Sequence, residues 1–332
     1  MTQTATQRIA AAQSGDQQAF SDLVEPYRAE LLVHCYRLLG SPQDAEDMVQ
    51  ETLLRAWNHL DRFTGGAYFR AWLYKIATNA CLDVLDRRSR RLLSPVQATP
   101  SDPSAPLTPP NPELLWLEPF PDELLPDSAL GPEARYSLRE SITLAFLAAL
   151  QLLPPRQRVT LILCDVLDWR ASDVAQLLDT TVSAVNSALH RARATMTSHY
   201  TGNDAALSLD GKVRGVLKRY LDAWESGDVD TLVTLLAENI VFAMPPMSEW
   251  YRGSAAVRVM ATALLRPDQW RLRETRANNQ IAFAFYQHQD DGSYHFSALQ
   301  LIKVDDGKLS DVQMFFLPQI AASFGLPAVL AA

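Results

Sequence analysis

The sequence predicts a multidomain protein with two all-α domains, the second a helix-turn-helix, followed by a C-terminal α+β cone. Apolar residues recur with a helical period over residues 6–91 and 134–200. The intervening segment, 92–133, contains 11 of the 20 prolines of the chain. From residue 207 to 332, helices are followed by alternating strands that are separated by Asp-Gly turns. These changes of pattern give the predicted domain boundaries.

Charge is distributed unevenly along the chain. The 332 residues carry a formal net charge of −8, and residues 92–140 contain two basic and eight acidic groups. Tight binding of duplex DNA depends on neutralising phosphates, so this charge argues against a protein that binds DNA unaided. The segment 87–91 nevertheless holds four arginines.

Targeting and metal-binding signals are absent from the sequence. The first 14 residues are polar, and no apolar run approaches the roughly 20 residues of a membrane helix. We therefore expect a cytoplasmic protein with no membrane contact. The three cysteines are scattered singly, and no Cys/His spacing resembles a zinc site. We expect neither a metal nor a cofactor.

The first helical block has two clear boundaries. Apolar spacing predicts a helix that stops at Gly40, and Ser41 is a suitable N-cap for the next helix, with an acidic residue three positions on. In that helix Asp44, Asp47 and Glu51 form one acidic stripe. Such a stripe suits a basic protein partner, although an ordinary solvated face has the same pattern.

A third helix is expected over about 67–91. It combines aromatic residues, Asn79 and Asp83 with the arginine cluster at its end. Arginines near a helix C-terminus are favoured by the helix dipole alone. The alternative is contact with a nucleic-acid backbone beside captured bases.

The proline-rich segment is predicted to be extended, and about 40 residues could span on the order of 120 Å. Within it, residues 114–121 contain Trp116, Phe120 and several leucines. Free spacers rarely keep such residues. We expect a docking segment, or a small cluster that packs on a neighbouring domain.

A helix-turn-helix is predicted from 171–178, a turn at 179–181, and a second helix over 182–196. A plain helical hairpin fits the same pattern. Outward positions of the second helix carry hydroxyl, amide, imidazole and guanidinium groups, which suit phosphate and base-edge contacts. These positions are Ser183, Asn186, Ser187, His190, Arg191 and Arg193.

The C-terminal block begins with predicted helices over 213–224 and 231–237. Strands are then expected at 240–244, 280–287, 293–304 and 309–316, which together indicate a curved sheet wrapped on helices. Aromatic residues in this block fit a core or a small apolar pocket. They are Tyr220, Trp224, Phe242, Trp250, Phe283, Phe296 and Phe315.

Three motifs resemble the extracytoplasmic-function (ECF) sigma factors of the sigma-70 family. DAEDMVQETLLRAW at 44–57 resembles the polymerase-binding helix, and WLYKIATNACLDVLDRR at 72–88 resembles the promoter-melting helix. LPPRQR at 153–158, followed by the helix-turn-helix, resembles the fourth domain of these proteins. Asp86 departs from the family pattern, in which arginine is common.

The resemblance implies a role for each matching residue. Facing the clamp of core RNA polymerase would be Asp44, Asp47, Gln50 and Glu51. Near the minus-ten element of promoter DNA would be Asn79, Asp83, Arg87, Arg88, Arg90 and Arg91. At the minus-thirty-five element would be Arg156, Arg158 and the outward residues of the second helix of the helix-turn-helix. The polymerase flap would be a further contact, and the acidic linker would lie in the RNA channel.

The C-terminal block resembles the SnoaL-like branch of the nuclear-transport-factor-2-like fold, and the motif WLEP at 116–119 resembles the long-linker actinobacterial subgroup with such an extension. A regulatory domain in contact with the sigma domains is then expected. A small apolar ligand would suit its pocket. His295 and Asp311 are the candidates for catalysis, which we do not expect. The alternatives are a bifunctional protein with a C-terminal enzyme and a ligand-sensing helix-turn-helix repressor.

Overall fold

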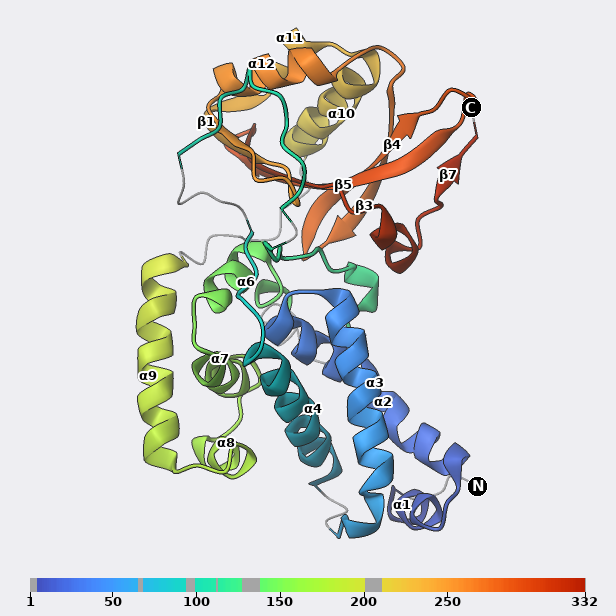
Figure 1. The fold of residues 1–332 in the computed structure, drawn as a ribbon, viewed down its shortest axis with the longest axis vertical. Coiled ribbons are helices and arrows are strands. Elements are labelled where there is room, and N and C mark those ends of the chain that lie inside the picture. The colour runs from blue at the N-terminus through green and yellow to red at the C-terminus, as the bar shows by residue number, and fades with distance from the viewer. Residues whose placement is uncertain are drawn as a thin grey trace. The chain divides into compact units, whose positions relative to one another are not determined.

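The computed structural model describes residues 5–64, 68–93, 99–111, 113–126, 138–200 and 211–331 (Figure 1). The chain divides into two compact units. The first unit combines Met1–Arg91 with Leu124–Gly202, and the second combines Leu92–Glu123 with Asn203–Ala332. The segment between the two helical domains thus belongs to the same unit as the C-terminal domain.

The first half of the first unit consists of helices whose ends are fixed by local side chains. They are α1 (Ala5–Gln13), α2 (Gln17–Leu39), α3 (Pro42–Asn58), the short 3₁₀ helix η1 (Leu60–Arg62) and α4 (Phe69–Leu85). Gly40 ends α2 in the left-handed conformation (φ 74°), and the Ser41 side chain accepts a hydrogen bond from the Asp44 backbone. Both predicted boundaries are confirmed. The third helix is shorter than expected, since the chain turns at Asp86 before the arginine cluster.

The second half of this unit is a bundle built on a helix-turn-helix. Its elements are α6 (Leu144–Gln151), α7 (Pro155–Leu161), the π-helical turn η4 (Ile162–Val166), α8 (Ala171–Leu177) and α9 (Val182–His199). The Thr181 side chain caps α9 by accepting from the Ala184 backbone. Val185, Leu189 and Met196 form the buried face of α9, so its other face is free to carry polar residues.

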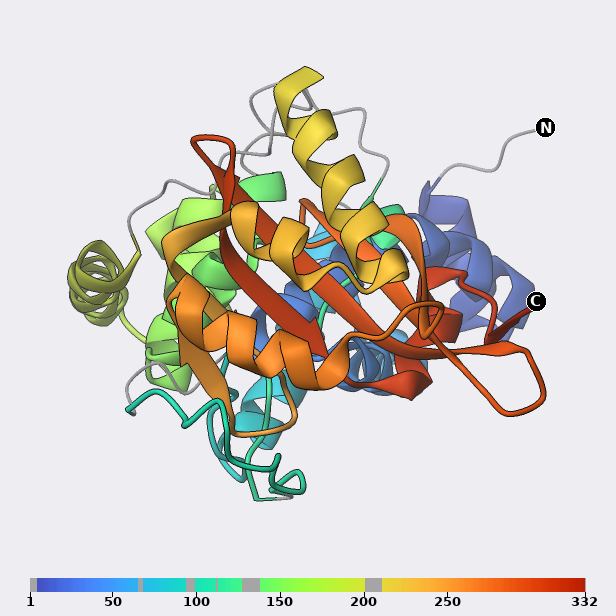
Figure 2. The ribbon, with the colours of Figure 1, turned by 90° about the horizontal axis from the view of Figure 1, so that it is seen from above.

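The second unit is a sheet covered by helices. In the sheet the strand order is β2-β1-β6-β5-β4-β3, and β7 pairs with β5. The helices are α10 (Gly211–Ser226), α11 (Val229–Thr234) and α12 (Ser254–Leu264). The strands are β1 (Leu236–Ala243), β2 (Trp250–Arg252), β3 (Trp270–Ala277), β4 (Gln280–His288), β5 (Tyr294–Asp305), β6 (Lys308–Phe315) and β7 (Val329–Leu330). Figure 2 shows α10, α11 and α12 lying over the sheet.

All four expected strands are present, as β1, β4, β5 and β6, but one predicted helix end differs and α12, β2, β3 and β7 were not predicted. The second predicted helix ends at Thr234, and Leu236–Ala243 form a strand that pairs in parallel with β6. The strand β3 was not anticipated, although it pairs along its whole length with β4. The core lies between the helices and the sheet, where the Trp224 ring packs edge-on against Phe285 at 4.9 Å.

The described part of the proline-rich segment lies along the second unit and is not a separate tether. We call its residues within Leu92–Glu123 the strap. The backbone NH of Ser101 donates to the Trp250 carbonyl (2.9 Å), and the Thr108 NH donates to Glu249 (2.8 Å). In Figure 1 this teal chain runs beside β1 and α12. Prolines keep the segment out of helices and sheets, but its extended backbone and apolar side chains remain able to bind a folded surface.

The apolar island of the strap, predicted to dock, is buried. Trp116, Leu117 and Phe120 are at most 5% exposed. Its C-terminal end meets the turn between β3 and β4, where Asn278 and Asn279 adopt positive φ, as a two-residue hairpin turn requires. The Phe120 NH donates to Asn278 Oδ1 (2.8 Å), and the Asn278 NH donates to the Phe120 carbonyl (3.0 Å).

Replacing Phe120 with alanine should lower the free energy of unfolding of the second unit by about 3–5 kcal/mol, because a buried ring is lost and a cavity is left. Leu107→Ala, on the same strap at a side chain that is 39% exposed, is the matched control and should have an effect of about 0.5 kcal/mol or less. Hydrogen exchange of the β3 and β4 amides in the full chain measures both. Equal protection in the two variants would show that the strap contributes nothing to this unit.

Candidate functional site

The acidic face of α3 borders an open groove between α3 and α4. Asp47 and Gln50 are exposed, and Glu51 is half-buried and pairs with Arg55 Nε at 2.6 Å. The groove has a volume of about 510 Å³ and is also lined by Asp83, Arg87 and Arg88 of α4 and the turn after it. Residues predicted to contact a protein partner and residues predicted to contact DNA therefore lie on opposite sides of one groove.

Asp44 differs from the other acidic residues of this face. Its Oδ2 accepts from Arg88 Nη1 at 2.7 Å and from Arg91 Nη2 at 2.6 Å, and its side chain is 18% exposed. Burial acts to raise the pKa of Asp44, but the hydrogen bonds from Arg88 and Arg91 outweigh burial and the pKa is lowered. Asp44 is therefore ionised near neutral pH and bound to the arginine cluster.

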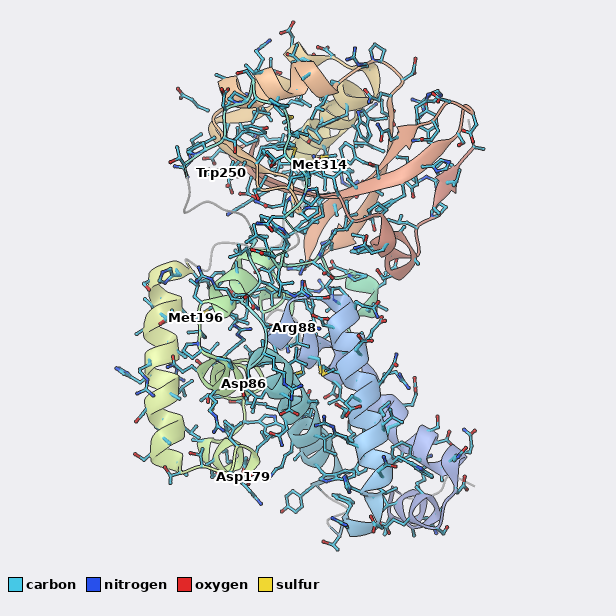
Figure 3. The ribbon with its side chains drawn as sticks, viewed as in Figure 1. Asp86, Arg88, Asp179, Met196, Trp250 and Met314 are labelled. Carbon is cyan, nitrogen blue, oxygen red and sulfur yellow. The ribbon has the colours of Figure 1, made fainter. Side chains whose placement is uncertain are left out.

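The polar end of α4 presents a mixed surface. Asn79 and Asp83 are exposed, and Asp83 accepts from Arg55 Nη1 at 3.4 Å. Beyond the helix end, Arg87 and Arg90 are exposed, whereas the Arg91 side chain is only 10% exposed. Asp86 and Arg88 lie at this end of the helix in Figure 3.

The outward residues of α9 form one solvated face. The members that are exposed are Ser183, Asn186, Ser187, His190, Arg191 and Arg193. Arg193 is already paired, since its Nε and Nη2 donate to the two carboxylate oxygens of Asp165 at 2.9 and 2.7 Å. The hydrogen bond to Asp165 raises the pKa of Arg193. Arg156, at the start of α7, is exposed.

Arg158 corrects a prediction from the sequence. It is 2% exposed, and its Nη1 donates to the Leu38 carbonyl at 2.5 Å and to Gln151 Oε1 at 2.9 Å. Its Nη2 donates to the Gln151 and Leu153 carbonyls. Burial lowers the pKa of Arg158 to about 10, which leaves it charged near neutral pH. In this arrangement Arg158 is a structural residue and is not exposed to DNA.

Arg158 is one of several contacts that join α2 and α4 to α6–α9, an arrangement we call closed. Arg37 Nη2 donates to Ser141 Oγ at 2.7 Å, and the Tyr74 and Trp169 rings lie 5.3 Å apart. Lys75 Nζ lies 3.0 Å from Asp179 Oδ1, in the turn between α8 and α9 (Figure 3). Sequence reasoning missed these residues, although Arg37 interrupts an apolar helical pattern and could have been a signal.

Burial shifts the pKa of two side chains of α2, His34 and Arg37. His34 Nε2 lies 2.9 Å from Thr78 Oγ1, and burial, with the neighbouring Arg37 and Arg70, lowers the pKa of His34 to about 3. Burial also lowers the pKa of Arg37 to about 10. His34 is therefore neutral and Arg37 is charged near neutral pH.

The candidate catalytic residues of the second unit are not brought together. Asp311 on β6 is opposite Lys303 on β5, and His295 lies eight residues before Lys303 on the same strand, about 26 Å away at the usual rise of a strand. His295 is exposed and Asp311 accepts from Gln313 at 2.9 Å. They do not form one acid–base site.

The aromatic residues predicted to line a core or pocket are all buried. Tyr220, Trp224, Phe242 and Phe283 belong to the core cluster between the helices and the sheet, which also contains Met314, labelled in Figure 3. Trp250, Phe296 and Phe315 are buried outside that cluster. A small apolar ligand stays a prediction.

Comparison with known proteins defines the family. The model of sigma-70 region 2 matches residues 23–91, that of sigma-70 region 4 matches 143–196, and that of the SnoaL-like domain matches 217–312. The chain is 41% identical over 314 residues to the ECF RNA polymerase sigma factor SigG of Mycobacterium tuberculosis, covering 93% of this chain and 84% of the relative. The chain belongs to the ECF RNA polymerase sigma factors and carries a C-terminal SnoaL-like domain.

A further relative matches about half of this chain, and a solved structure matches most of it. SigW of Bacillus subtilis, an ECF RNA polymerase sigma factor, is 27% identical over 56% of this chain and 91% of its own length. The crystal structure of the M. tuberculosis ECF sigma factor SigJ matches with a TM-score of 0.58 at 23% identity, covering 93% of this chain and 99% of that chain, which supports the same fold.

Among the described residues, no helix has the length and apolarity needed to span a membrane.

Replacing Arg158 with methionine should lower the free energy of unfolding of the first unit by about 2–4 kcal/mol, because the Leu38, Gln151 and Leu153 acceptors would be left buried without their donor. Arg156→Met, two residues earlier at an exposed position, should change it by about 0.5 kcal/mol or less. Urea unfolding followed by circular dichroism compares them. Equal midpoints would show that Arg158 does not hold the unit together.

Proposed function

We propose that this sigma factor binds core RNA polymerase through the exposed acidic face of α3 and contacts promoter DNA at two places. The arginine-rich end of α4 would contact the minus-ten element, and the outward face of α9 would contact the minus-thirty-five element. The observation that carries this assignment is the groove whose α3 side is acidic and whose far side carries Arg87 and Arg88. Opposite charge attracts a basic protein surface on one side and phosphates on the other.

Run-off transcription with purified core polymerase tests the assignment. Asp47→Asn should weaken core binding several-fold, because it removes an exposed charge from the acidic face, whereas Asn186→Ala should leave core binding unchanged and lower use of promoters with an intact minus-thirty-five element. Fluorescence anisotropy measures core binding and transcript yield measures promoter use. Loss of core binding in both variants, or in neither, contradicts the division of roles.

The closed arrangement cannot engage both promoter elements at once. Elements about 25 base pairs apart are separated by on the order of 80 Å along B-form DNA. In the structure the turn of the helix-turn-helix touches α4, since Lys75 Nζ is 3.0 Å from Asp179 Oδ1. Lys75, Asn79 and Asp83 also lie on one stripe of α4. We infer that the helix-turn-helix must leave α4 before promoter DNA is bound.

Charge exchange at this contact tests the inference. Lys75→Asp places two carboxylates together and should shift the closed-to-open equilibrium about 1.4- to fivefold toward open, because an exposed pair contributes about 0.2–1 kcal/mol. The double variant Lys75→Asp/Asp179→Lys should return it toward the original value. Energy transfer between dyes on α1 and α9 of the full chain reports the separation. A double variant as open as the single one would contradict the contact.

We propose that the SnoaL-like domain regulates initiation through the strap rather than by catalysis. The strap joins the two sigma domains, and its Phe120 is buried in the second unit. While the strap stays bound, it cannot lengthen when the sigma domains separate. The separation of His295 and Asp311 gives no support to an acid–base enzyme.

A test of this regulation must keep the domain. Deleting 207–332 would expose Trp116, Leu117 and Phe120, which are buried in the intact chain. Phe120→Ala releases the strap with the domain still attached and should change transcript yield at least twofold, while Leu107→Ala should not. Equal yields from the two variants and the natural chain would reject regulation through the strap.

A further inference from the structure

The acidic stripe of α3 contains two aspartates in different surroundings. Asp47 is exposed and accepts a long hydrogen bond from Gln43 at 3.4 Å. Asp44, one turn earlier, is partly buried, and one of its carboxylate oxygens accepts from both Arg88 and Arg91. The same residue type at adjacent turns therefore faces solvent in one case and the arginine cluster in the other.

The position of Asp44 follows from the way α3 and α4 meet. Ser41 caps α3, so Asp44 lies in the first helical turn, where the dipole stabilises a negative charge. The chain that leaves the C-terminal end of α4 reaches this turn with Arg88 and Arg91. Four arginines within residues 87–91 repel one another, and a fixed carboxylate among them offsets part of that repulsion.

The side-chain exposures divide the cluster into an anchor and a contact surface. Arg91 is 10% exposed and Arg88 is 48% exposed, and Arg87 and Arg90 are exposed. Asp44 therefore holds Arg91 against α3, and through Arg88 it fixes the direction of the short segment that carries the exposed guanidinium groups. A segment held in this way loses less conformational entropy when it binds phosphates.

We propose that Asp44 is a positioning residue for the minus-ten contact and not a ligand of the polymerase. It orients Arg87, Arg88 and Arg90 toward the phosphates of the minus-ten element, while Asp47, Gln50 and Glu51 remain the polymerase-facing residues. This proposal rests on the proposed function for the location of the minus-ten contact. It separates two roles within one stripe, and the separation can be measured.

The experiment compares Asp44→Asn with Asp47→Asn in the full chain. One assay measures affinity for core polymerase. The other measures affinity of the assembled holoenzyme for fork-junction DNA with a single-stranded minus-ten element, at several salt concentrations. Asp44→Asn should keep core affinity within twofold, lower fork-junction affinity about tenfold, and reduce the salt slope by about one or two because fewer phosphates are contacted together. Asp47→Asn should show the opposite pattern.

A charge exchange tests whether the ion pair itself acts. Asp44→Arg should be more damaging than Asp44→Asn, and Asp44→Arg/Arg91→Asp should recover part of the fork-junction affinity, because an ion pair forms again while Arg87, Arg88 and Arg90 are kept. Unfolding midpoints of Asp44→Asn and the exchange variant that equal that of the natural chain exclude a general loss of folding as the cause.

Three results overturn the proposal. Weakened core binding by Asp44→Asn would make it a polymerase ligand. Unchanged fork-junction affinity in Asp44→Asn would show that the arginines need no anchor, and lack of recovery in the exchange variant would show that the ion pair does not act. Unchanged core binding in Asp47→Asn would instead contradict the proposed function. The two failures can be told apart because fork-junction affinity is measured on holoenzyme that has already formed.

Discussion

A buried guanidinium at the end of a helix holds the first unit in its closed arrangement. Burying the charge of Arg158 is costly, and the acceptors within reach are carbonyl and amide oxygens rather than carboxylates. One of them, the Leu38 carbonyl, lies in the last turn of α2, where carbonyls lack helical partners and the dipole is negative. The contact therefore satisfies two groups that would each be costly alone. Leu38 belongs to α2 and Arg158 to α7, so this hydrogen bond links the two helical parts of the first unit.

Such an interface differs from a hydrophobic core in how it opens. Arg37 with Ser141 and Lys75 with Asp179 are polar contacts that water can replace once the two parts separate. Arg158 keeps its bonds to Gln151 and Leu153 when Leu38 is lost, so its own domain still satisfies part of the guanidinium. The polar contacts of the closed arrangement can therefore be exchanged for contacts with another surface. This suits a protein whose two helical domains contact distant elements of DNA.

Local features were predictable because their causes are local. Ser41 and Gly40 fix the ends of helices through their own backbone and side-chain chemistry, and the buried face of α9 follows from helical spacing. Pairings between distant segments were not predictable. LPPRQR predicts an exposed basic turn equally for Arg156 and Arg158, and only the packing of α7 buries one of them. In the same way the acidic spacing of α3 does not distinguish Asp44 from Asp47. In β3, the residues between Trp270 and Ala277 include three arginines and a glutamate, and these charges concealed the strand pattern.

The strap gives the chain an unusual connectivity. The chain leaves the first unit after Arg91, belongs to the second unit through Glu123, returns to the first unit, and enters the second unit again after Gly202. Each sigma domain is therefore attached directly to the second unit, and the attachment points near 92 and 123 belong to the same folded body while Phe120 remains buried. Under the proposed function, burial of the apolar island would limit how far the two sigma domains can separate, and would so link the stability of the C-terminal unit to initiation.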